Sequence, residues 1–182
     1  MHRFLGRESV QGVTFLVGTE SEETAAVRVR MRAAIELLAR KSPRTLARLR
    51  RGPRYILLAP AGNGVAFDPA TRATSLDLRT VAHSEPERVA VMLGVGAASA
   101  RFGWMNFRPS PDERAQMFRR FGIEGRALLV ELGASYPTRE WFRRWMPTIP
   151  PSPREAERTA EAVSVANKAP RWLLRALQFF LK

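Results

Sequence analysis

Every strand signal in this chain of 182 residues lies before residue 80, and the segments after that point have helical spacing. Runs rich in β-branched and apolar residues occupy 9–17, 55–58, 65–67 and 74–78, and each predicts one strand. A chain that gathers its strands in one part and continues with helices alone is typical of an α+β fold. We therefore expect a small sheet of about four strands, covered largely on one face by helices.

Turn and capping residues predict how these elements connect. Gly62 and Asn63 tolerate positive φ, so the segment 61–64 should form the turn of a hairpin that joins 55–58 to 65–67. The clearest helix start is Ser84, which should act as an N-cap with Glu87 reaching back to it. Helices are expected at 25–40, 43–51, 85–102 and 111–132, followed by a short aromatic helix that Thr138 caps.

Four prolines crowd the stretch after residue 146 and divide the chain. They predict an α+β domain at 1–146, a proline-rich linker at 147–153 and a helical C-terminal extension at 154–182. The last helix is amphipathic, since its cations share one narrow stripe and most of its other residues are apolar. Such a helix must cover its own domain, a partner or a membrane interface. Its candidate contact residues are Arg171, Trp172, Arg175, Phe179, Phe180 and Lys182.

Several enzyme classes are excluded by residues that the chain lacks. It has no cysteine, and His2 and His83 are its only histidines, so disulfide frameworks, thiolate zinc sites and three-histidine sites are ruled out. A Gly-x-Ser-x-Gly elbow and a phosphate-binding loop are also absent. No apolar run reaches the length of a membrane span, and the N-terminus lacks the pattern of a signal peptide. We expect a cytoplasmic protein without a cofactor, with a peripheral membrane location as an open alternative.

Positive charge is the strongest compositional signal. The chain has 30 lysine and arginine residues against 17 acids, which gives a formal net charge of +13. Seven cations without an intervening acid form a basic run: Arg40, Lys41, Arg44, Arg48, Arg50, Arg51 and Arg54. The run suits a phosphate backbone or an acidic protein, although a solvated helix face would have the same pattern. A second, aromatic-basic patch combines Trp141, Phe142 and Trp145 with Arg139, Arg143 and Arg144.

The segment 89–99 contains Gly94-x-Gly96-x-x-Ser99, which approximates a dinucleotide-binding turn. The local context favours another interpretation, because Ser84 already starts a helix before the glycines and no second strand-helix unit follows. The small residues of this helix then allow close packing against its neighbours.

The same helix belongs to a longer pattern over residues 10–131. A strand, a long helix, an arginine-rich Ser-Pro segment, a short strand pair and a capped helix ending in Ser99-Ala100-Arg101-Phe102 follow one another. This order resembles a family of small bacterial zincin-like metallopeptidases, whose corresponding helix carries His-Glu-x-x-His followed by Ala-Arg. The aligned positions here are Val95, Gly96 and Ser99. Valine and glycine can neither bind zinc nor move a proton, and serine alone is a poor zinc ligand.

The resemblance therefore implies a zincin-like fold with a degenerate motif, no catalytic residue and no metal. The family places an acidic third ligand in the following helix, where this chain offers Glu113, Glu124 and Glu131. We expect a non-catalytic, zincin-like interaction protein, a pseudo-metallopeptidase, that binds an acidic protein partner through its arginine-rich surface or its C-terminal helix. Two alternatives stay open: a peripheral membrane or nucleic-acid binder driven by net positive charge, and, as a lesser alternative, an active metallohydrolase with an unrecognised site.

Overall fold

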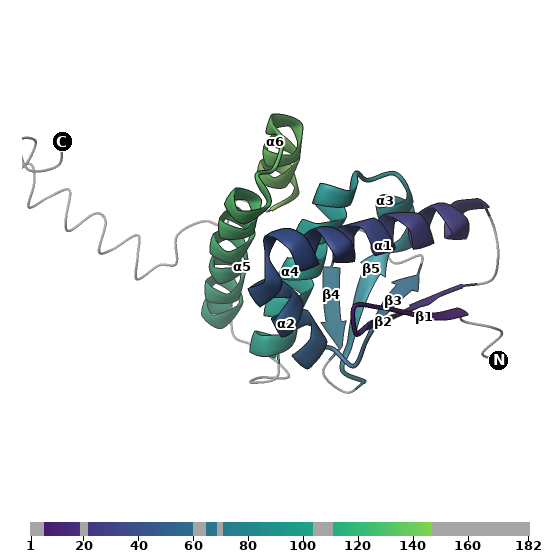
Figure 1. The fold of residues 1–182 in the computed structure, drawn as a ribbon. Helices are drawn as coiled ribbons and strands as arrows, with labels where there is room; N and C mark the ends of the chain where they lie inside the picture. Colours follow the sequence, from purple (N-terminus) through teal and green to yellow (C-terminus); the bar gives the residue numbers. More distant parts are fainter. Residues whose placement is uncertain (1–5, 19–21, 60–64, 69–70, 104–110, 147–182) are drawn as a thin grey trace, which may run out of the picture. The chain divides into compact units, whose positions relative to one another are not determined.

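A computed structural model of the chain describes residues 6–18, 22–59, 65–68, 71–103 and 111–146 (Figure 1). The chain divides into two compact units, Met1–Pro147 and Thr148–Lys182, and all described residues belong to the first. The expected linker at 147–153 and the expected helical extension at 154–182 lie outside the described residues.

The sheet is mixed and has five strands in the order β1-β2-β3-β5-β4. The three central strands run parallel, and each edge strand is antiparallel to its neighbour. The strands are β1 Gly6–Val10, β2 Val13–Val17, β3 Tyr55–Ala59, β4 Val65–Asp68 and β5 Ala73–Asp77.

The fifth strand comes from the region predicted as one strand at 9–17, which is instead a β-hairpin. Gln11 and Gly12 both have positive φ, +50° and +74°, and they form its two-residue loop. Positive φ at both loop residues is the geometry that matches the twist of a tight hairpin. The prediction was wrong here because glutamine before glycine is a weaker turn signal than asparagine.

The predicted hairpin between 55–58 and 65–67 is also wrong. β3 pairs in parallel with β5, and β4 pairs only with β5, so β5 lies between them. The antiparallel pair is β4–β5. Leu76 of β5 is fully buried and Leu58 of β3 nearly so, so packing into the apolar interior decides the strand order over the local turn signal at 61–64.

The helices follow the predicted spacing with three local differences. Asp77 ends β5 and caps an unpredicted helix, because its Oδ2 accepts hydrogen bonds from Thr80 N at 2.8 Å and Thr80 Oγ1 at 2.6 Å. Ser135, not Thr138, occupies the N-cap position of the last described helix, and Glu87 does not reach back to Ser84. The helices are α1 Glu22–Lys41, α2 Pro43–Arg51, α3 Leu78–Ala82, α4 Pro86–Gly103, α5 Pro111–Leu132 and α6 Tyr136–Trp145.

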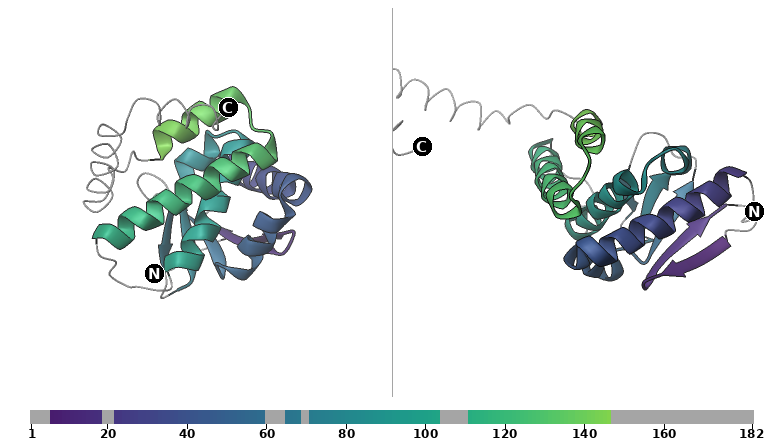
Figure 2. Two further views of the ribbon diagram at one scale, coloured as in Figure 1. Left: turned by 90° about the vertical axis from the view of Figure 1, so that its left-hand side faces the viewer. Right: turned by 45° about the horizontal axis from the view of Figure 1, so that its top comes forward.

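The elements form three layers, with the sheet, then α1 and α4, then α5 and α6 (Figures 1 and 2). Alternation along β2 shows which face of the sheet is covered, since Val13, Phe15 and Val17 are buried while Thr14 and Leu16 are half-buried. α1 contacts β1 and β2, α4 contacts β4 and β5, and the two helices contact each other. The chain thus has the expected α+β fold, with a sheet covered by helices on one face.

α4 is the central helix of this arrangement. It contacts α1, α2, α5 and α6 as well as the sheet, and its residues 89–93 are fully buried. Gly94 allows α5 to approach, because a Cβ there would lie 2.3 Å from Leu128 Cδ2. Both glycines of the segment 89–99 are inside this helix, so the dinucleotide-turn interpretation is wrong and the close-packing interpretation holds.

Candidate functional site

The α4 positions that align with the His-Glu-x-x-His motif lie in the packed interior. Val95 is buried, and a Cβ at Gly96 would lie 2.7 Å from Thr74 Cγ2 of β5. Ser99 is buried, and its Oγ donates a hydrogen bond of 3.0 Å to the carbonyl oxygen of Val95 one turn earlier. Gly96 therefore lies against the sheet, and the buried Ser99 hydroxyl has its hydrogen-bond partner within α4.

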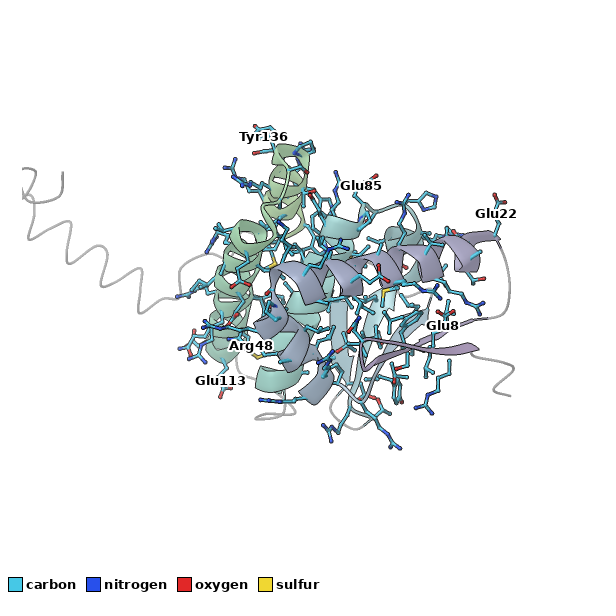
Figure 3. The ribbon with its side chains drawn as sticks, in the orientation of Figure 1. Glu8, Glu22, Arg48, Glu85, Glu113 and Tyr136 are labelled. Carbon is cyan, nitrogen blue, oxygen red and sulfur yellow. The ribbon has the colours of Figure 1, made fainter. Side chains whose placement is uncertain are left out.

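The acidic residues of α5 do not converge on these positions. Glu124 pairs with Arg48 of α2, and Glu131 accepts a short hydrogen bond from Ser42 between α1 and α2. Glu113 is exposed in the first turn of α5 (Figure 3). His83 is exposed at the C-cap of α3, where its Nδ1 lies 2.9 Å from the carbonyl oxygen of Arg79. Among the described residues, no group of three or more His, Asp or Glu side chains is placed to hold a metal ion.

The seven cations of the predicted basic run are all exposed, and we call them the arginine cluster: Arg40, Lys41, Arg44, Arg48, Arg50, Arg51 and Arg54. Arg40 and Lys41 lie in the last turn of α1, and Arg48, Arg50 and Arg51 lie in the last turn of α2. Cations at a helix C-terminus interact favourably with its unpaired carbonyl groups, by about 0.3–1 kcal/mol each. Stabilisation of the two helix C-termini therefore explains part of the clustering of cations here.

Two members of the arginine cluster have hydrogen-bond or ion-pair partners within the described part of the fold. Arg48, which Figure 3 labels, forms a 2.7 Å ion pair through its Nη1 with Glu124 Oε2. Arg50 Nε donates a 2.5 Å hydrogen bond to the carbonyl oxygen of Gln11. The other five form no ion pair within the described residues. The cluster therefore keeps most of its charge available to a partner.

Sequence inspection missed an eighth cation at this end of the molecule. Arg72 lies in the β4–β5 turn with φ +56°, and its Nη2 donates a 3.1 Å hydrogen bond to the carbonyl oxygen of Gly52. The backbone N–H of Arg54 in turn donates to the carbonyl oxygen of Arg72 at 2.7 Å. Arg54 and Arg72 are 18 positions apart in the chain, and the pairing of β3 with β5 brings them together.

The aromatic-basic patch divides between the core and the surface. Phe142 is buried against Gly125, where an added Cβ would lie 2.2 Å from its Cζ. Trp141 and Trp145 are half-buried and stack, with ring centroids 5.1 Å apart and ring planes 13° apart. Arg143 pairs with Glu140 at 2.6 Å, and Arg139 Nε donates to the carbonyl oxygen of Ala134 at 2.9 Å. Phe142 therefore belongs to the core, whereas Trp141 and Trp145 form a stacked pair at the surface.

Glu87 of α4 forms hydrogen bonds with the start of α6. Its Oε2 accepts hydrogen bonds from Ser135 N at 3.1 Å, Ser135 Oγ at 2.9 Å and Thr138 Oγ1 at 3.0 Å. Burial raises the pKa of the Glu87 carboxyl, but these bonds and the charge of Arg88 outweigh it, so the pKa lies below its ordinary 4.5. The carboxylate thus acts as a distant cap for α6.

Replacement of Glu87 by glutamine should lower the free energy of unfolding at pH 7 by about 1–2 kcal/mol, because a carboxylate acceptor of three donors is lost. Since the folded-state pKa is lowered, this stabilisation is present above the unfolded-state pKa and is lost as pH falls through the folded-state pKa. Urea unfolding should therefore show a larger difference between wild type and variant at pH 7 than at pH 3. The exposed Glu85→Gln is the control, and an equal loss in that variant at pH 7 would refute the capping role.

The expected partner helix lies outside the described residues, so its residues from Arg171 to Lys182 stay a prediction. Within the described part of the chain, every helix is too short or too polar to cross a membrane.

Comparison with known proteins found no match, whether to a family profile, to a curated protein or to a solved structure.

Proposed function

We propose that this chain is a non-catalytic binding protein on a zincin-like scaffold, and that its arginine cluster holds an acidic protein partner. The observation that carries the proposal is the state of the cluster: seven exposed cations, of which only Arg48 pairs with a carboxylate in the described part of the fold. Arginine suits such a role, because its planar guanidinium binds carboxylates in two-point geometry.

The packing of α4 supports the non-catalytic part of this proposal. Where the resembled peptidases carry two histidines and a glutamate, Val95 and Ser99 are buried and Gly96 lies against Thr74. An apolar contact at these positions leaves neither a ligand nor a proton carrier for hydrolysis. Kinship to that family is part of our proposal and rests on the sequence resemblance.

Carboxylates beside the cluster favour a protein over a nucleic acid. Glu124 is within 2.7 Å of Arg48, and Glu131 bonds to Ser42 at the start of α2. The rigid backbone of a nucleic-acid duplex carries negative charges at fixed spacing and would bring some of them close to both carboxylates, whereas a flexible acidic chain can keep its carboxylates away from them and against the unpaired guanidinium groups. Tyr55 is the only aromatic residue close to the cluster in sequence, so base stacking has little support.

The test compares three immobilised probes at 150 mM and 500 mM salt: poly-L-glutamate, a 20-base-pair DNA duplex and vesicles that contain phosphatidylserine. We expect retention on poly-L-glutamate that falls roughly 10-fold or more in Arg44→Ala/Arg51→Ala, because two unpaired guanidinium groups are removed. The matched control is Arg79→Ala/Arg126→Ala, which removes two exposed arginines outside the cluster and should change retention less than about 2-fold.

Two outcomes contradict the proposal. Equal loss in both double variants would mean that net charge alone drives retention. Tighter retention on the duplex or on the vesicles than on poly-L-glutamate would instead support the nucleic-acid or membrane alternative.

A further inference from the structure

A hollow of about 570 Å³ lies between α6 and the start of α4. Six of its lining residues come from α6, and Arg88 of α4 completes it. The α6 residues are Tyr136, Pro137, Glu140, Trp141, Arg144 and Trp145. They repeat at one-turn spacing, so the hollow follows the helix and is lined by rings along its length. Tyr136 at the outer end of α6 is 73% exposed (Figure 3), which is unusual for a large aromatic side chain with no external partner.

The rings and the guanidinium group of Arg88 form one continuous stack. Arg88 Cζ lies 5.7 Å from the centroid of the Trp141 ring, and Trp141 stacks on Trp145. The stack fixes the Arg88 side chain, so little rotamer entropy remains to be lost when it binds a ligand. Its Nε is buried and has no hydrogen-bond partner in the described part of the chain. A buried, unsatisfied N–H of a cation is costly unless an acceptor is supplied.

The charge left in the hollow is positive. Glu140, its one acid, pairs with Arg143 at 2.6 Å. Glu87, the acid next to Arg88 in the chain, already accepts three hydrogen bonds from α6 through its Oε2. Arg144 is exposed and forms no ion pair within the described residues. Arg88 and Arg144 therefore place two cations beside the aromatic rings, where they can bind an anion.

The exposure of the rings favours a peptide over a nucleobase as the ligand of this hollow. One face of Trp141 is against Trp145 and Arg88 lies over its ring, while Phe142 lies tilted 6.1 Å from the Trp145 ring. A nucleobase needs open ring faces to stack on, and of the three rings that line the hollow only that of Tyr136 is largely exposed. Ring edges and the exposed Tyr136 suit apolar peptide side chains, while the guanidinium groups suit carboxylates.

We propose that this hollow binds an acidic peptide segment of a partner protein, with a carboxylate between Arg88 and Arg144 and an adjacent apolar side chain against Tyr136 and the two tryptophans. The site is built from residues outside the arginine cluster and does not depend on it. A partner that used both surfaces would be held at two points, and its apparent affinity would exceed that of either contact.

The test uses the full chain and a fluorescein-labelled peptide, Asp-Glu-Phe-Asp-Leu with blocked ends, beside a twin in which asparagine and glutamine replace the acids. We expect saturable binding of the acidic peptide by anisotropy, and at least roughly 10-fold weaker binding of the neutral twin. Arg144→Gln should weaken binding of the acidic peptide roughly 5-fold or more, and Trp145→Ala should weaken both peptides. Because Arg144 is exposed, its replacement should leave thermal unfolding unchanged, so a failure to fold is not confused with a failure to bind.

Arg79→Gln removes an exposed arginine outside both the arginine cluster and the hollow, so it is the matched control and should bind the acidic peptide like wild type. If Arg79→Gln and Arg144→Gln weaken binding equally, the peptide senses net charge and this proposal is overturned, whatever happens to the arginine cluster proposal. Absence of binding up to roughly 1 mM peptide overturns it as well. Tighter binding of a thymidine decanucleotide with the same dependence on Arg144 would replace the peptide by a nucleic acid.

Discussion

Gly96→Glu is expected to lower the free energy of unfolding by about 4 kcal/mol or more, which is a large part of the stability of a domain of this size. An added Cβ would lie 2.7 Å from Thr74 Cγ2 and 3.4 Å from Val65 Cγ1, so α4 would have to move away from β4 and β5. The carboxylate would then be buried among apolar side chains without a cation, where it is costly or takes up a proton. Guanidinium chloride unfolding followed by far-ultraviolet circular dichroism measures the loss.

Two further variants control this experiment. Gly18→Glu adds the same side chain where a Cβ meets nothing within 4 Å, and it should change stability by less than about 0.5 kcal/mol. Thr74→Ser removes the methyl group that opposes Gly96, so it should relieve part of the loss caused by Gly96→Ala. If Gly96→Glu unfolds like wild type, the position is open to solvent, and the argument against a catalytic glutamate there fails.

Phe15→Ala should cost about 3–5 kcal/mol, the usual range for removing a fully buried phenylalanine. Phe15 has no exposed surface, lies at the centre of β2 and is paired in register with Glu8 and Ile56. Leu16→Ala, one residue later on the other face of the sheet, should cost about 1 kcal/mol, because Leu16 is only half-buried. Both values come from the same denaturant titration.

The difference between these two variants tests whether one face of the sheet is covered. Equal costs for Phe15→Ala and Leu16→Ala would mean that another segment or molecule packs on the second face in solution. A loss below about 1.5 kcal/mol for Phe15→Ala would contradict the packing of α1 against β2.

Helix positions could be predicted well from the sequence, and strand neighbours could not. The apolar spacing between Val27 and Leu38 predicts the buried side of α1, since both residues are fully buried. Helical spacing is a local property, which a single segment reveals. The insertion of β5 between β3 and β4 depends on contacts across the sheet, and the turn residues at 61–64 contain no information about them.

The candidate sites follow the same division. Exposure of the arginine cluster is predictable because Arg44, Arg48 and Arg51 alternate with Leu46 and Leu49 on α2. The roles of Arg72 and Arg88 are not, since each meets its neighbours only through tertiary packing. The aromatic residues of α6 stand out in sequence, but the core position of Phe142 depends on the absence of a side chain at Gly125, 17 residues earlier.

The placement of the two edge strands has a consequence for self-association. Among the described residues, the apolar parallel strands β2, β3 and β5 are interior to the sheet, and its edges are β1 and β4, of five and four residues. β1 carries Arg7 and Glu8, and charged, short edges are poor templates for a strand from another molecule. β2 becomes an edge only if β1 detaches, and β5 only if β4 does. Loss of an edge strand alone would therefore expose an apolar strand that can pair with another molecule.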